Sequence, residues 1–215
     1  MSYVIRLALP ADHSRIDALR QSAYGAATWF RVADASALLL ASDPPHTRVL
    51  VACAEDAPET PVATVAIARS DTPQTLCDVV GAQVPTGWAP TPALSVMRLA
   101  ASRDHQGGAL NHAMRLWFIR AAMASDAECF CSSQARGTPN IDGMQRLGYE
   151  YREAPSSQQQ VVQIAEPTLW LNRLCRSQFE ATLRRTQQLL DDKSVAHRWQ
   201  GPPLNFKVHA STPLG

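Results

Sequence analysis

Hydrophobic and polar positions along the chain switch repeatedly between the period of strands and the period of helices. Residues 3–9 alternate enough for a strand, and Pro10 and Asp12 then supply the fixed φ angle and the side-chain acceptor with which helices begin. In the next segment Ile16, Leu19 and Ala23 share one face at helical spacing. The chain is therefore expected to open with a strand and an amphipathic helix.

The same patterns predict the remaining elements. The expected strands cover residues 3–9, 48–54, 61–69, 94–101, 128–134, 149–153 and 159–165. Helices are expected after Asp12, at residues 33–41, from Leu110 to Ala121, at residues 140–147, and as one stripe of about 24 residues between Pro167 and Lys193. This order predicts a mixed α/β fold, with one domain over residues 1–165. Residues 166–215 are expected to form a C-terminal helix and tail that pack on this domain or extend it.

Composition narrows the class of protein. The 215 residues are 46% hydrophobic and 18% charged, which excludes disorder as the main state. The net charge of +1 gives no broad patch for nucleic acid or an anionic membrane. Apolar runs are far shorter than the roughly 20 residues of a membrane span, and the five scattered cysteines fit a reducing compartment. We expect a cytoplasmic protein with no metal site, since no metal-ligand spacing is present.

One junction suggests binding chemistry. The strand at 94–101 runs through Gly107 and Gly108 into a helix, which places unpaired backbone N–H groups at the positive end of the helix dipole. Such an end binds phosphate, and Arg103 or Gln106 could add donors. A purely structural turn is the alternative.

Residues 97–110 and 140–151, together with the order of elements over residues 3–165, resemble the N-acyltransferases of the GNAT superfamily. This resemblance implies an acyl-CoA co-substrate whose pyrophosphate lies on the loop amides and whose pantetheine arm pairs with the preceding strand. Gly107 and Ala109 match the family's loop motif, whereas its first position is Asp104 here. The implied cofactor-binding residues are Leu99, Ala100, Ala101, Arg103, Gln106, Gly107, Gly108, Ala109 and Asn140.

The resemblance departs at the catalytic positions. The family's general acid is often a tyrosine where this chain has Met144, and no acidic residue lies between Leu94 and Ser102. The candidate catalytic residues are therefore Ser95, Arg98, Ser132 and Tyr149. Arg98, on an otherwise apolar strand, either pairs with a carboxylate structurally or faces an acidic substrate group.

A narrower resemblance is to the acyl-homoserine-lactone synthases and long-chain N-acyl amino acid synthases of the same fold. Arg20, Tyr24 and Trp29 approximate one family pattern, and residues 97–99 approximate another. The glutamate of that second pattern is Ser95 here. The candidate substrate-binding residues are Tyr24, Trp29 and Phe30, although packing in the core is the alternative for the aromatic pair at 29 and 30.

These observations lead to an expected function and its alternatives. We expect transfer of an acyl group from acyl-CoA to a primary amine of a small molecule or amino acid by direct attack. An acyl carrier protein is the alternative donor, and its docking patch would be Arg103, Arg115, Arg120 and Arg136. A non-catalytic relative that binds acyl-CoA is a further alternative, and the C-terminal helix is a possible homodimer contact.

Overall fold

The computed structural model describes residues 1–26, 31–32, 35–44, 46–106, 109–135, 141–155, 162–163 and 168–206. Its strands are β1 (Ser2–Leu7), β2 (Arg31–Val32), β3 (Arg48–Ala54), β4 (Pro61–Ser70), β5 (Ala93–Ala101), β6 (Cys129–Ala135), β7 (Glu150–Pro155), β8 (Val162–Gln163), β9 (Thr168–Cys175) and β10 (Ala196–Gln200). Its α-helices are α1 (His13–Gly25), α2 (Pro73–Val80), α3 (Leu110–Met123), α4 (Ile141–Leu147) and α5 (Phe179–Asp192). Short 3-10 helices are η1 (Pro10–Asp12), η2 (Ala35–Leu38), η3 (Leu40–Ser42), η4 (Arg103–His105) and η5 (Arg176–Gln178).

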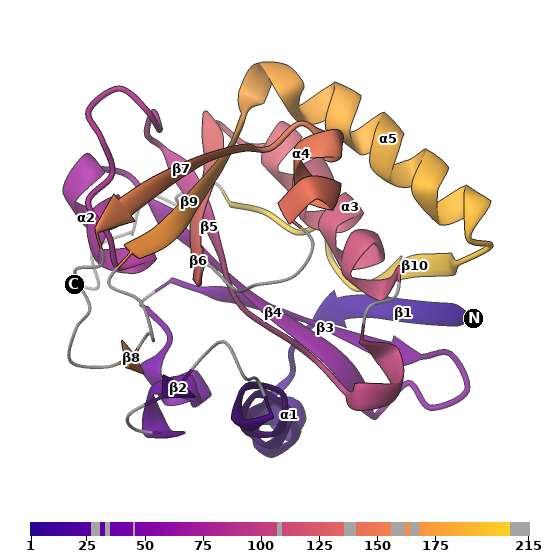
Figure 1. Ribbon diagram of the computed structural model, residues 1–215. Coiled ribbons are helices and arrows are strands. Elements are labelled where there is room, and N and C mark those ends of the chain that lie inside the picture. The colour runs from indigo at the N-terminus through magenta and orange to yellow at the C-terminus, as the bar shows by residue number, and fades with distance from the viewer. Residues whose placement is uncertain are drawn as a thin grey trace, which may run out of the picture.

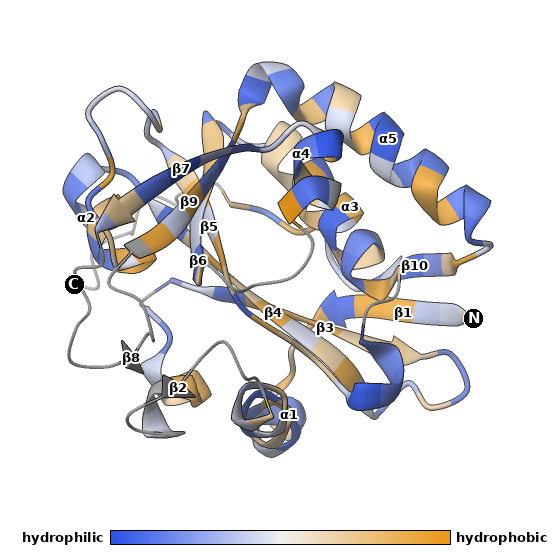
Figure 2. Cartoon of the chain, in the orientation of Figure 1, coloured by the Kyte–Doolittle hydropathy of each residue, from blue (hydrophilic) through white to orange (hydrophobic). Residues whose placement is uncertain are grey.

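An eight-stranded mixed sheet forms the centre of the molecule, in the order β10-β1-β3-β4-β5-β6-β9-β7 (Figure 1). The pairs β1/β10 and β5/β6 are parallel, and the other neighbours are antiparallel. The edge strand β7 is mostly hydrophilic (Figure 2), which protects a sheet edge from pairing with another chain.

Helices cover both faces of this sheet. In Figure 1, α3, α4 and α5 lie on one side and α1 lies on the other. Three aromatic rings join α3, β6 and α5: Phe130 lies 5.2 Å from Phe118 and 5.4 Å from Phe179 between ring centroids. All three are buried, and burying each stabilises the fold by about 1.5–3 kcal/mol.

Most of the expected elements are confirmed, but the described part of the helix expected at residues 33–41 is instead formed by the 3-10 helices η2 and η3. The first helix ends at Gly25 and buries Ile16 and Leu19, and the expected hairpin is β3–β4. The helix after the glycine turn begins at Leu110, as its apolar spacing predicted. Gly148 ends α4 with a φ of 108°, a conformation that favours glycine.

The expected C-terminal helix is wrong in its first half, where the chain forms β9. Leu171 and Leu174 look like one helical stripe in the sequence, but they face opposite sides of the sheet. Leu171 packs with the residues around α2, and Leu174 packs with those around α3. Because β9 lies between β6 and β7 and is buried on both faces, its apolar positions do not alternate cleanly. The helix itself, α5, begins at Phe179 and packs on α3.

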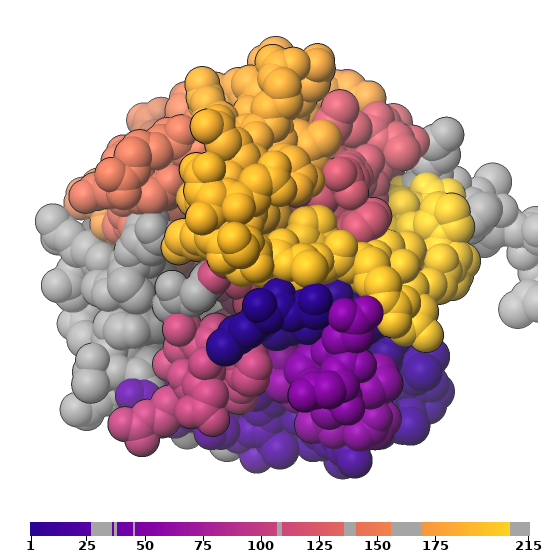
Figure 3. Space-filling model, turned by 90° about the vertical axis from the view of Figure 1, so that its right-hand side faces the viewer, coloured from indigo at the N-terminus to yellow at the C-terminus, as the bar shows by residue number. Residues whose placement is uncertain are grey.

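The segment expected as a tail adds another strand. β10 pairs in parallel with β1, so that the beginning and the end of the described chain lie side by side (Figure 3). Leu204 and Phe206 then enter the core, where Arg69 donates a hydrogen bond of 2.8 Å to the Phe206 carbonyl.

Two expectations fall partly outside the described residues. Of the strand expected at 159–165, only β8 is described, and it pairs with β2 in a separate two-stranded sheet. The predicted domain boundary at residue 165 lies outside the described ranges. Within those ranges, none of the helices has the length and apolarity that a membrane crossing requires.

Candidate active site

β5 and β6 pair at their beginnings and then part. Their ladder consists of Ala93 opposite Cys129 and Leu94 opposite Phe130. Beyond Leu94, no strand in the described part of the chain pairs with β5 on that side. Where the ladder ends, the Val96 N–H donates a hydrogen bond of 2.7 Å to the Ser132 hydroxyl. The candidate catalytic residue Ser132 is thus placed where the two strands separate.

A β-bulge then changes the direction of the β5 side chains. Thr64 of β4 lies opposite Ala100, and Ala66 lies opposite Met97, so that Arg98 and Leu99 share a single partner residue on β4. Arg98 has a φ of 50°, which is unusual for a residue other than glycine. The bulge turns Arg98 towards the 3-10 helices η2 and η3.

Two arginines meet one aspartate at this point. Asp43 accepts two hydrogen bonds from Arg20, of 3.0 and 3.1 Å, and it also forms an ion pair with Arg98. Arg98 donates further to the carbonyls of Leu39 and Ser42, at 3.2 and 2.7 Å. We call Arg20, Asp43 and Arg98 the Asp43 cluster. Of the two alternatives for Arg98, the structure shows the ion pair with a carboxylate.

Sequence reasoning identified both arginines of the cluster and missed Asp43. The Arg20 side chain is fully buried, and burial is the main reason why the pKa of Arg98 lies below its ordinary value. A buried arginine needs a carboxylate. The feature of the sequence that could have identified Asp43 is therefore an acidic residue that lies between the two arginines and directly precedes Pro44 and Pro45.

Tyr24 approaches β5 from α1. Its hydroxyl donates a hydrogen bond of 3.2 Å to the carbonyl of Leu99, which links the candidate substrate-binding and cofactor-binding segments. Burial raises the pKa of Tyr24 to about 12. The other two candidate substrate-binding residues, Trp29 and Phe30, lie outside the described residues.

The turn between β5 and α3 is described except for its two glycines. η4 follows β5, and the Gln106 side-chain amide donates a hydrogen bond of 3.0 Å to the Ala101 carbonyl. Arg103 is exposed. α3 follows with Ala109 at its N-cap, and this residue makes no side-chain capping hydrogen bond to the first backbone N–H groups of the helix. Gly107, Gly108 and Asn140 lie outside the described residues.

The remaining candidate catalytic residues are buried. Ser95 has no exposed surface, and its hydroxyl has no hydrogen-bond partner among the described residues. The Tyr149 hydroxyl accepts a hydrogen bond of 2.8 Å from Arg115. Since Arg115 is itself only 6% exposed, it is not available for the expected carrier-protein docking patch. Arg103 and Arg120 are exposed, and Arg136 lies outside the described residues.

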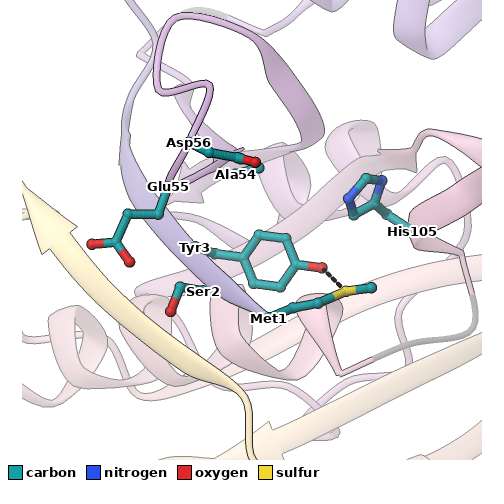
Figure 4. A pocket seen from close by; sticks show the side chains of 7 residues that line it. All are labelled: Met1, Ser2, Tyr3, Ala54, Glu55, Asp56 and His105. Atoms are coloured by element: carbon teal, nitrogen blue, oxygen red, sulfur yellow. Dashed lines mark hydrogen bonds between the residues drawn. The ribbon is translucent and has the colours of Figure 1, made fainter.

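A hollow of about 400 Å³ lies beside the turn and is lined by Met1, Ser2, Tyr3, Ala54, Glu55, Asp56 and His105 (Figure 4). The ring of His105 makes an edge contact with Tyr3, with centroids 5.9 Å apart, and shares a hydrogen bond of 2.9 Å with the Ser102 hydroxyl. The lining includes two acidic residues, Glu55 and Asp56, and no lysine or arginine side chain, which does not favour phosphate groups.

The cysteines of β6 offer no reactive thiol. Burial raises the pKa of Cys129 to about 12 and also raises that of Cys131, so that both are protonated at neutral pH. In the described part of the chain, no three or more His, Cys, Asp or Glu side chains are grouped so that they could hold a metal ion.

Comparison with known proteins identifies the fold. No protein-family model and no curated protein matches the sequence. Among solved structures, the chain is similar to the CoA-dependent acyl-homoserine lactone synthase BjaI with SAM and isopentyl-CoA (TM-score 0.57, 12% identity, covering 94% of this chain and 96% of that one). It is also similar to FeeM, an N-acyl amino acid synthase from uncultured soil microbes (TM-score 0.58, 14% identity, covering 86% of this chain and 97% of that one). A third similar structure is nourseothricin acetyltransferase (TM-score 0.53, 18% identity, covering 80% of this chain and 98% of that one). The chain therefore has the fold that GNAT acetyltransferases share with acyl-homoserine lactone and N-acyl amino acid synthases.

Proposed function

We propose that this protein is an N-acyltransferase that moves an acyl group from a CoA thioester to a primary amine. The observation that carries the proposal is that β5 parts from β6 and then leads through the turn into α3, whose N-cap residue makes no side-chain capping hydrogen bond. The free edge of β5 offers backbone groups to an extended pantetheine arm, and the first turn of α3 offers N–H groups to phosphate. Enzymatic acyl transfer by proteins of this fold supports the assignment.

The proposed reaction relies mainly on positioning. The amine nitrogen attacks the thioester carbonyl, the new C–N bond forms, and the C–S bond breaks as the amine proton passes to water and the thiolate leaves. Ser132 is the group that we assign to the reacting carbonyl, because its hydroxyl keeps a donor after accepting from the Val96 N–H. Holding the two reactants in an attacking geometry supplies much of the rate.

Thermal shift with CoA, acetyl-CoA and longer acyl-CoAs tests the proposal, because a ligand that binds only the folded state raises the melting temperature. Arg103→Glu should weaken CoA binding about tenfold at low salt, and the difference should shrink as salt rises, because this side chain is exposed. The matched control is Arg152→Glu, which reverses an exposed charge on β7. If no CoA compound stabilises the wild type, acyl-CoA is not its ligand.

A second candidate is synthesis of an N-acyl amino acid or signal molecule with an acyl carrier protein as donor. The similarity to BjaI and FeeM, over 94% and 86% of this chain, supports this class of product, whereas BjaI is itself CoA-dependent and gives no support to a carrier protein as donor. Release of free thiol from acyl carrier protein, but not from acyl-CoA, would establish this second candidate. Acyl-CoA binding without release of thiol for any amine offered would instead indicate a non-catalytic relative.

A further inference from the structure

α3 buries an arginine whose charge no carboxylate balances among the described residues. Arg115 is 6% exposed, its Nη1 donates to the Tyr149 hydroxyl, and its buried Nε has no hydrogen-bond partner. Arg6 and Arg20 are buried to a similar degree, but each binds both oxygens of an aspartate. Among the described residues, Arg115 therefore differs from the buried Arg6 and Arg20 in having no carboxylate partner.

The groups around Arg115 are aromatic or basic. Its guanidinium carbon lies 5.0 Å from the ring centroid of Tyr149 and 5.5 Å from that of Phe118. Burial lowers the pKa of His112 to about 4, and Arg115 and Lys193 act in the same direction, so that His112 is neutral at pH 7. Burial also raises the pKa of Tyr151 to about 12, with Arg115 opposing that shift. No negative group therefore faces the guanidinium among the described neighbours.

A row of polar side chains leads from the parted strands towards this arginine. Ser132, Asn172 and Tyr151 are in register across β6, β9 and β7, and residues in register point to the same face of a sheet. That face is the one covered by α3, because Phe130 and Leu174 of the same strands pack there with α3 residues. Ser132 and Asn172 are buried, at 6% and 7% exposure.

A buried charge without a counter-charge is costly, and a ligand that brings a carboxylate to it would offset that cost. The Nη1 atom of Arg115 donates to the Tyr149 hydroxyl. The other side of the guanidinium, which carries Nε and Nη2, can therefore donate to both oxygens of a carboxylate. Arg115 lies five residues along α3 from Leu110, which is about 8 Å at the rise of an α-helix. Arg115 therefore lies on the side of the site that we assign to the acyl donor, farther along α3 than the turn that we assign to the CoA phosphates.

We propose that Arg115 binds the carboxylate of an acyl group that itself ends in a carboxylate, so that the donor is the CoA thioester of a dicarboxylic acid. This inference rests on the proposed function and adds the class of acyl group. It assigns Arg115 as a specificity residue and leaves the chemistry at the thioester unchanged.

The test compares dissociation constants for paired donors by titration calorimetry. Succinyl-, glutaryl- and adipoyl-CoA are each compared with butyryl-, pentanoyl- and hexanoyl-CoA of the same carbon number. The wild type should prefer the carboxylate member of at least one pair, and Arg115→Met should lose that preference by about 30-fold or more. Arg184→Met, at an exposed arginine on α5, is the matched control and should keep the preference.

Further readouts separate binding from packing. Without ligand, Arg115→Met should melt no lower than the wild type, because it removes an uncompensated buried charge; where it melts much lower, the comparison of donors rests on Arg115→Lys. Arg115→Lys keeps the charge but not the planar fork and should keep part of the preference. This variant tests the proposal even where Arg115→Met does not fold.

The possible failures are distinguishable. If no CoA compound binds the wild type, the proposed function fails. If both members of every pair bind alike in the wild type and in Arg115→Met, only the role of Arg115 fails. The acceptor is tested by thermal shift with amino acids and the amines that lack their carboxyl group. Arg115→Met could remove the preference for amino acids over amines that lack the carboxyl group and leave the preference among CoA thioesters unchanged. The carboxylate that Arg115 binds would then belong to the acceptor, and its assignment to the donor would be overturned.

Discussion

At the scale of single residues, Asp43 connects parts of the chain that are far apart in sequence. It receives Arg20 from α1 and Arg98 from the bulge of β5, and it lies directly after η3. One carboxylate thus compensates two arginines next to the free edge of β5. The position of the bulge, and with it the backbone of Leu99, depends on this cluster.

Asp43→Asn should lower the free energy of unfolding by about 3–5 kcal/mol, because it leaves two guanidinium groups without a counter-charge. Urea unfolding measures this change. The matched control is Asp71→Asn at the partner of Arg69, where the Asp71 side chain is 53% exposed and the expected loss is about 1 kcal/mol or less. Equal losses in the two variants would contradict a buried role for Asp43. Adding Arg98→Met to Asp43→Asn should recover part of the stability.

His112 should make the fold sensitive to mild acid. Burial lowers its pKa from 6.5 to about 4, so that the unfolded chain takes up a proton at a higher pH than the folded chain. Stability from His112 is therefore full above about pH 6.5 and is lost as the pH falls towards 4, by up to roughly 3 kcal/mol. Urea unfolding at several pH values should show a shallower loss for His112→Leu. His13→Gln, at an exposed histidine, should keep the wild-type slope, and His197, whose pKa burial also lowers, should leave some slope in both variants.

At the scale of elements, sequence patterns worked where turn and cap residues mark the ends of an element and failed where none do. Pro10 and Gly25 bound the first helical region, the polar segment 55–60 separates β3 from β4, and two glycines precede α3, so that these elements were predictable. No glycine or proline separates β9 from α5. β9 is covered on both faces, so its apolar residues imitated a helix. β10 was missed because its pairing partner, β1, is about 190 residues away, and short-range periodicity carries no information about such pairing.

A chain that ends at Asp192 should lose several kcal/mol of stability compared with one that ends at Phe206. The shorter chain lacks the pairing of β10 with β1 and the buried side chains of Leu204 and Phe206. Urea unfolding followed by far-ultraviolet circular dichroism compares the two. Equal midpoints would show that residues 193–206 contribute nothing to the fold.

At the scale of the whole molecule, the sheet is held together at one seam by little backbone pairing. β5 and β6 share two residue pairs, while the neighbouring pairs β4/β5 and β6/β9 run along most of their strands. The seam is closed instead by the Ser132 hydroxyl and by the helices that cover it. The sequence could suggest a candidate site because a glycine turn before a helix is a local pattern. The Asp43 cluster and the unbalanced Arg115 were not, because they depend on which distant side chains the fold brings together.

The parallel pair of β1 and β10 also sets an order of events during synthesis. β1 emerges from the ribosome before β3 and β10, and one of its edges can pair with β3 as soon as the hairpin is made. Its other edge waits until residues 196–200 have been translated. During that interval the nascent sheet ends in a strand with an open row of backbone donors and acceptors, the feature that most readily recruits another chain. Once residues 196–200 are free to pair, β10 covers this edge, so that a segment made late protects one made early.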